Sequence, residues 1–166
     1  MVCISKEITL DELCVISSYA PGRIEVGIHG RVNMMHSKRK LVSNYLTFIH
    51  KSEDIQNKQT LFLMEETRDE HMPILEDELG THVFSGYTLA SFEELPKLVA
   101  AGVTHVSIDG IFHDAAYVCE ALRLYTAILS GADPIAIKED YVQRYAQDHV
   151  TNGFYETKTS KLKVGE

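Results

Sequence analysis

The sequence predicts an α/β protein built as part of a (β/α) barrel, with one inserted β-hairpin. Short β-branched runs alternate with amphipathic helical patterns, which favours parallel strands joined by helices. The chain has 166 residues, whereas a complete eightfold barrel takes about 250, so we expect half of one. We place this domain at residues 1–150 and a C-terminal tail at 151–166.

The N-terminal third predicts a strand, a helix and a second strand. Residues 2–5 are a β-branched run, and Thr9–Glu12 has the spacing of a capping box that starts a helix. Pro21-Gly22 ends that helix. Residues 24–28 form the next strand candidate, which ends at His29-Gly30. This succession favours parallel pairing of the two strands.

The middle of the chain carries the inserted hairpin. We predict a helix over Asn33–Phe48, because its apolar residues fall near one face. Thr60–Met64 and His71–Leu75 then predict an antiparallel pair, an insertion at about residues 59–76. A further short strand is expected at residues 81–85.

The last third predicts a helix, a strand and two further helices. Ser91–Glu94 has the spacing of a capping box, and Gly102 is placed to end the helix that follows. Thr104–Ile108 predicts a strand. Two helices are expected after it, one over His113–Leu129 and a more polar one over Pro134–Gln147 that lies outside the core.

Composition excludes several classes of protein. The chain has 24 acidic and 16 basic residues, a formal net charge of −8, which argues against non-specific coating of nucleic acid. No apolar run approaches about 18 residues, so we expect no membrane span. The acidic N-terminus does not resemble a signal peptide. Cys3, Cys14 and Cys119 are odd in number and widely spaced, which indicates a reduced, cytoplasmic protein.

Charge is nevertheless distributed unevenly along the sequence. No acidic residue occurs from Val26 to Lys51, and five basic residues do: Arg31, Lys38, Arg39, Lys40 and Lys51. Tyr45 and Phe48 are interleaved with them. Basic residues mixed with aromatic ones are typical of surfaces that hold single-stranded RNA.

Two candidate site residues end predicted strands. His29 and Asp109 occupy equivalent places on two strands, and the carboxyl ends of strands form the active face of (β/α) barrels. We therefore predict catalytic roles for both, at one mouth. The structural alternatives are a histidine capped by backbone and an aspartate that caps the helix beginning near His113.

A second candidate group is Glu76, Asp77 and His82, which has the composition of an acid–base site. No metal-binding spacing accompanies it, so we expect no metal. The alternative is a salt link between this segment and Arg39 or Arg68.

Basic side chains supply the predicted substrate contacts. Arg39, with Lys38 and Lys40, has the chemistry to bind phosphate or carboxylate, and a solvated helix face is the alternative. We add Arg68 and Tyr45 to this set. The sequence holds no Gly-x-Ser-x-Gly, and no cysteine has a histidine nearby, so no nucleophile is identifiable.

Several blocks together resemble the U32 peptidase family, the collagenase-like proteases. They are Glu25–Gly30, Met35–Tyr45, Arg68–Gly86 and Val106–Ile111, and the likeness runs from Val2 to about Thr157. The resemblance implies the C-terminal half of a TIM-like barrel, because family members begin with further β/α units. It also implies either a C-terminal fragment or a short form, which would self-associate through unpaired strand edges.

The resemblance carries expectations about chemistry. Asn33 and Lys40 stand where the family's signature cysteines lie, so no iron–sulfur cluster is expected. This cysteine-poor version looks like a branch implied in prephenate-dependent hydroxylation of a wobble uridine of tRNA, beside a second U32 protein. The alternatives are a peptidase, as the family name states, and a non-catalytic partner subunit.

Overall fold

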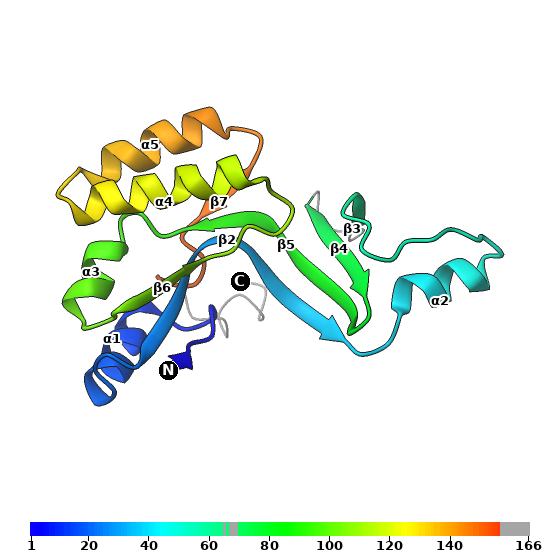
Figure 1. Cartoon of the computed structure of the whole chain (residues 1–166), viewed down its shortest axis with the longest axis horizontal. Helices are drawn as coiled ribbons and strands as arrows, with labels where there is room; N and C mark the ends of the chain where they lie inside the picture. Colours follow the sequence, from blue (N-terminus) through cyan, green and yellow to red (C-terminus); the bar gives the residue numbers. More distant parts are fainter. Residues whose placement is uncertain (65, 67–69, 157–166) are drawn as a thin grey trace. The chain divides into compact units, whose positions relative to one another are not determined.

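A computed structural model describes residues 1–64, 66 and 70–156. The elements, in order, are β1 (Val2–Cys3), α1 (Leu10–Tyr19), β2 (Ile24–Ser37), α2 (Leu41–Phe48), β3 (Leu61–Met64), β4 (His71–Asp77), β5 (Gly80–Ala90), α3 (Leu95–Ala100), β6 (His105–Ile108), α4 (Ala115–Leu129), α5 (Pro134–Arg144) and β7 (His149–Thr151) (Figure 1). The described part of the chain is therefore a mixed α/β structure.

The strands of the described residues form an open, seven-stranded sheet. Its order is β1-β2-β5-β4-β3, while β6 pairs with β2 and β7 pairs with β5. The pairs β1·β2, β2·β6 and β5·β7 are parallel, and β3·β4 and β4·β5 are antiparallel. The predicted parallel pairing and the predicted hairpin are both confirmed. No described helix is both long enough and apolar enough to cross a membrane.

The chain divides into two compact units. The first comprises Met1–Gly30 and Tyr87–Glu166, and the second comprises Arg31–Gly86. Strands β2 and β5 each contribute residues to both units. Each unit is described separately below.

In the first unit, local sequence signals set the helix ends. Thr9 and Glu12 form the expected capping box of α1. Gly102, with φ of +89°, follows the end of α3. Ile24, Val26 and Ile28 are buried on β2. Helices α4 and α5 lie side by side, joined by a hydrogen bond between Tyr141 and Tyr117 (Figure 1).

The second unit contains the β3–β4–β5 antiparallel strands, helix α2 and the end of β2. Its small core consists of Met72, Ile74 and Val83, against which Val42 and Leu61 pack. The strands β3 and β4 pair antiparallel, which agrees with the predicted hairpin.

Three predicted elements are wrong. Residues 33–37, predicted as the start of the helix, instead continue β2, because β2 pairs with β5 and this pairing outweighs the helical spacing. The Ser85 hydroxyl on β5 also accepts the Val32 backbone N–H. The Ser91 capping box does not form, because the Ser91 hydroxyl contacts Tyr155 and α3 begins only at Leu95. Helix α5 is not outside the core, since Tyr141 is 1% exposed.

Candidate functional site

His29 lies at the centre of an aromatic cluster, which we call the tyrosine cage. Its side chain is fully buried. Nδ1 lies 3.1 Å from the hydroxyl of Tyr125, and Nε2 lies 3.0 Å from that of Tyr117 and 3.2 Å from that of Tyr141. Phe92 packs beside the ring, with centroids 5.8 Å apart. Strand β2 supplies the histidine, and α4 and α5 supply the tyrosines.

Hydrogen-bond accounting assigns the proton on the His29 ring. The Tyr125 hydroxyl donates its one hydrogen to the carbonyl of Ile28 and accepts the N–H of Ser91. In the remaining contact of this hydroxyl, its oxygen must therefore accept a hydrogen bond from His29 Nδ1–H. Nε2 is then the acceptor, and Tyr117 donates to it while accepting from Tyr141. All polar atoms of the ring are satisfied in this arrangement.

The cage keeps His29 uncharged. Burial lowers the pKa of its imidazole from 6.5 to about 4, and the nearby His113 acts in the same direction. At neutral pH the ring is thus a neutral imidazole, held at both nitrogens and closed to solvent. This geometry gives His29 a positioning role: it ties β2 to α4 and α5.

Asp109 follows β6 next to His29, but the two side chains have different partners. The backbones meet where Asp109 N–H donates to the His29 carbonyl, at 2.9 Å. The Asp109 carboxylate instead accepts from the backbone of Ile111. The alternative role as a helix cap is wrong, because Asp114 caps α4 by accepting from Tyr117 N–H.

Glu76 is a buried carboxylate in the second unit, where it caps helix α2. It accepts the backbone N–H groups of Val42 and Ser43, the hydroxyl of Thr81 at 2.9 Å, and the hydroxyl of Ser43. Burial raises the pKa of Glu76, but these hydrogen bonds outweigh it and the net pKa is lowered. The predicted salt link to Arg39 is wrong, since the Glu76 oxygens are bound to the start of α2.

Asp77 and His82 lie together in the same unit, and both side chains are partly buried. His82 Nε2 is 3.4 Å from Asp77, and its ring stacks on His36 with centroids 4.4 Å apart. Asn33 contacts His82 Nδ1. Burial raises the pKa of Asp77, but hydrogen bonds from the backbone of Leu79 and Gly80, together with the His82 ring, outweigh burial, so the net pKa is lowered. The pair therefore combines a carboxylate with an imidazole that can exchange a proton with it.

The predicted substrate residues fall in the second unit, around α2. Lys38, Arg39 and Lys40 are exposed between β2 and α2, and no ion pair within the described residues engages them. On α2, Tyr45 is 61% exposed and Phe48 is 81% exposed. We call these five residues the α2 surface. Arg68 lies outside the described residues.

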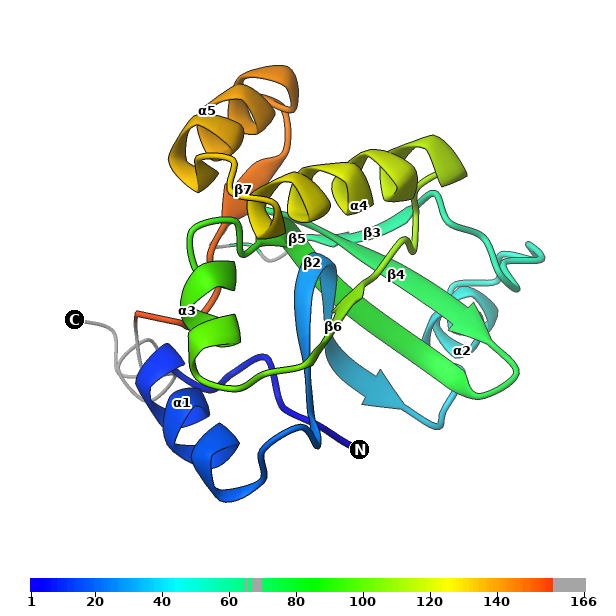
Figure 2. The ribbon, with the colours of Figure 1, turned by 60° about the vertical axis from the view of Figure 1, so that its left-hand side comes forward.

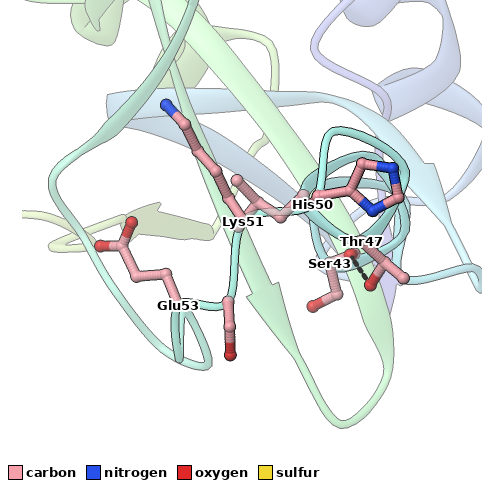
Figure 3. Close-up of a pocket in the computed structure, with 7 residues that line it drawn as sticks. Ser43, Thr47, His50, Lys51 and Glu53 are labelled. Carbon is pink, nitrogen blue, oxygen red and sulfur yellow. Dashed lines mark hydrogen bonds between the residues drawn. The ribbon is translucent and has the colours of Figure 1, made fainter.

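A shallow pocket adjoins the other side of α2. Its volume is about 470 Å³, and α2 and the loop after it line it. Figure 3 shows the Ser43 and Thr47 side chains near the His50 ring, with Lys51 and Glu53 on the following loop. The hydroxyl of Thr47 is already occupied by the carbonyl of Ser43. The lining combines hydroxyl groups, an imidazole and charges of both signs with the apolar side chain of Leu46.

The residues present do not fit an iron–sulfur cluster. Cys3 on β1, Cys14 on α1 and Cys119 on α4 are free thiols on three separate elements. Asn33 and Lys40 offer an amide and an amine, neither of which replaces a thiolate ligand. Residues 1–64, 66 and 70–156 also contain no group of three potential metal ligands.

Sequence reasoning missed the tyrosines of the cage and one lysine. Tyr117 and Tyr125 are eight residues apart, so they share one helix face, and this spacing was the available signal. Tyr141 belongs to a helix whose polar composition concealed it. Lys6 follows β1 and lies over Gly27, a contact that no local pattern indicates.

The chain is similar to one protein family and to two relatives of known name. The family model of peptidase family U32 matches residues 1–164. The tRNA hydroxylation protein P2 of Bacillus subtilis (strain 168) is 32% identical over 85% of this chain and 48% of its own length. The tRNA hydroxylation protein P of Haemophilus influenzae (strain ATCC 51907 / DSM 11121 / KW20 / Rd) is 21% identical over 79% of this chain and 39% of its own. No solved structure matches. The chain spans about half the length, or less, of these relatives.

Proposed function

Because this chain belongs to peptidase family U32, we propose that it serves in the hydroxylation of a wobble uridine of tRNA, a prephenate-dependent reaction. The support is its similarity to the tRNA hydroxylation proteins P2 and P. These two relatives also suggest a second family member as partner. We assign the strands β1, β2 and β6 to a partial (β/α) barrel. The proposed tRNA substrate supports a cytoplasmic location.

The α2 surface is the structural observation that supports this function best. Single-stranded RNA is held by cations that pair with phosphates and by aromatic rings on which bases stack. Phe48 and Tyr45 expose their rings, and Lys38, Arg39 and Lys40 lie just before the same helix. No acidic residue interrupts residues 26–52. We therefore assign the anticodon loop, which presents unpaired bases, to this surface.

The peptidase reading remains as the second function, and the family's name is what favours it. Proteolysis needs an activated nucleophile or its equivalent. Of the three cysteines, Cys3 and Cys119 are exposed, and neither has a hydrogen bond to a histidine in the described residues. A non-catalytic partner subunit is the third reading. The genetic test below separates a role in tRNA hydroxylation, as enzyme or as partner subunit, from the peptidase reading.

The decisive test is mass spectrometry of tRNA nucleosides from cells that lack this gene. We expect the hydroxylated wobble uridine to fall and to return when the wild-type gene is restored. Restoration with Phe48→Ala plus Tyr45→Ala should be poor, and restoration with Phe62→Ala should be complete. Phe62 is the matched control, because it is an aromatic residue 55% exposed on β3 and its position in the sequence is outside the basic run of residues 26–52. Unchanged tRNA in the deletion strain would refute the proposal.

A binding measurement on the purified chain separates RNA contact from other roles. Anisotropy of a labelled anticodon stem-loop should show weaker binding for the double aromatic variant, by roughly 1–3 kcal/mol per stacked base. Arg39→Ala should lower the slope of log affinity against log salt by about one. If neither the double aromatic variant nor Arg39→Ala alters RNA binding, then the α2 surface is not the RNA-binding site. The genetic result would not be affected by that outcome.

A further inference from the structure

The parallel strands β1, β2 and β6 have one apolar face and one polar face. Paired residues on parallel strands point to the same side. Cys3, Glu25 and His105 form one row, and Gly27 and Ser107 form the next. The alternate rows are apolar: Val2 with Ile24, and Val26 with Val106. Figure 2 shows β6 beside β2. We call the rows that hold Cys3 and Gly27 the polar strand face.

This polar strand face is unusual for parallel strands. Parallel sheets are generally covered on both sides and read as nearly continuous apolar runs. Here Glu25 and Ser107 are only partly buried, while Ile24 and Val26 on the opposite side are buried. The carboxyl ends of such strands are where ligands bind in α/β folds. Lys6, which follows β1, and Asp109, which follows β6, lie at those carboxyl ends, whereas Glu25 and His105 lie near the starts of their strands.

Lys6 reaches across this face. Its Cε lies 2.6 Å from the position that a Cβ on residue 27 would occupy, and its Nζ lies 3.5 Å from it. Only glycine leaves room for the lysine there. No hydrogen bond or ion pair within the described residues reaches Nζ. Burial lowers the pKa of the Lys6 amine, and the charges of Asp109 and Cys3 oppose that.

A half-buried ammonium has three N–H donors that need acceptors. The charge of Asp109 raises the pKa of Lys6, so the two groups are close enough to interact. One carboxylate oxygen of Asp109 already accepts the N–H of Ile111. The other oxygen is available to accept from a donor. Lys6 and Asp109 thus offer a cation for an anionic oxygen and an acceptor for a neighbouring hydroxyl or ammonium group.

We propose that the polar strand face binds a small carboxylic acid with a hydroxyl or amino group next to the carboxylate, whose carboxylate is held by Lys6 and whose donor is held by Asp109. Gly27 is a positioning residue, because its missing side chain admits Lys6. This site does not depend on RNA binding by the α2 surface, so each proposal stands or fails by itself.

The test is a nuclear magnetic resonance titration of the isotope-labelled chain with propionate, lactate and alanine. These three acids differ only in the group beside the carboxylate. We expect saturable shifts of the Gly27 and Ser107 amide signals, with millimolar dissociation constants for lactate, alanine or both. Propionate should bind more weakly. If lactate binds more tightly than alanine, the ligand class is a hydroxy acid. If alanine binds more tightly, it is an amino acid.

Four variants locate the binding on the protein. Lys6→Met should weaken binding about tenfold or more, as expected for a lost charge-assisted hydrogen bond, and Lys6→Arg should retain part of it. Gly27→Ala should weaken binding by displacing the end of a flexible side chain, with the fold intact. Lys97→Met, at an exposed lysine on α3, is the control and should bind as wild type.

Three results would overturn the proposal. They are the absence of saturable shifts with both lactate and alanine, equal affinity for propionate, and unchanged binding by a Lys6→Met protein whose amide spectrum remains dispersed.

Discussion

Acid should destabilise the first unit through His29. The pKa of His29 is about 4 in the folded chain and near 6.5 in the unfolded chain. Between these two pH values, the imidazole is protonated in the unfolded chain but stays neutral inside the tyrosine cage. The contribution of neutral His29 to the free energy of unfolding is complete above the pKa of the unfolded chain. It is lost as the pH falls toward the pKa of the folded chain. The full difference corresponds to about 3 kcal/mol, of which about 2 kcal/mol is lost between about pH 7.5 and about pH 5.

The measurement is urea denaturation of the wild type and of His29→Gln at both pH values. The variant starts from lower stability, because the tyrosine hydroxyls lose a partner, but its acid-dependent loss should be smaller by about 2 kcal/mol. Comparing the two losses cancels contributions common to both proteins, such as the raised pKa that burial gives Glu94. His149→Gln, at an exposed histidine of β7, is the control and should keep the wild-type loss. Equal losses in wild type and His29→Gln would refute the neutral, caged assignment.

Four further outcomes test other parts of the structure. Glu76→Gln should lower the free energy of unfolding by about 1–3 kcal/mol in urea, because the donors at the start of α2 lose a charged acceptor. Gly30→Ala should give mostly insoluble protein on expression, since Gly30 has φ of +106° and an added Cβ would lie 2.2 Å from a backbone oxygen. Protein purified without air should be colourless and free of stoichiometric iron, because Asn33 and Lys40 replace thiolates; a cluster absorbance would contradict this. Light scattering should show dimers or larger species, through the strand edge at Val2–Ser5, and a monomer at micromolar concentration would contradict it.

Local sequence patterns were sufficient for several elements. The Thr9 capping box and the Gly102 stop depend on residues within one helical turn, so they form as the spacing predicts. The antiparallel hairpin of β3 and β4 follows from two apolar runs separated by a short charged segment. Family membership was also readable from blocks of sequence, and the match over residues 1–164 confirms it.

Patterns failed where a distant partner decides the conformation. Residues 33–37 have helical spacing, yet they lie in β2, because pairing with β5 outweighs weak local preference. The Ser91 hydroxyl has a cap's spacing but contacts Tyr155, which is 64 residues away. Both partners, β5 and Tyr155, are far away in the sequence, so a local pattern does not indicate either contact.

The same division holds for the candidate sites. The sequence by itself indicated that Asp109 follows a strand parallel to the one that carries His29, and that the run before α2 is basic with interleaved aromatic residues. The prediction that the strand ends at His29 is wrong, because β2 continues to Ser37. Only the tertiary structure decided that His29 is enclosed by tyrosines 88 to 112 residues away, that Glu76 caps a helix, and that Lys6 crosses Gly27. Periodicity reports the face on which a side chain lies, whereas burial and hydrogen-bond partners depend on which other elements pack against that face.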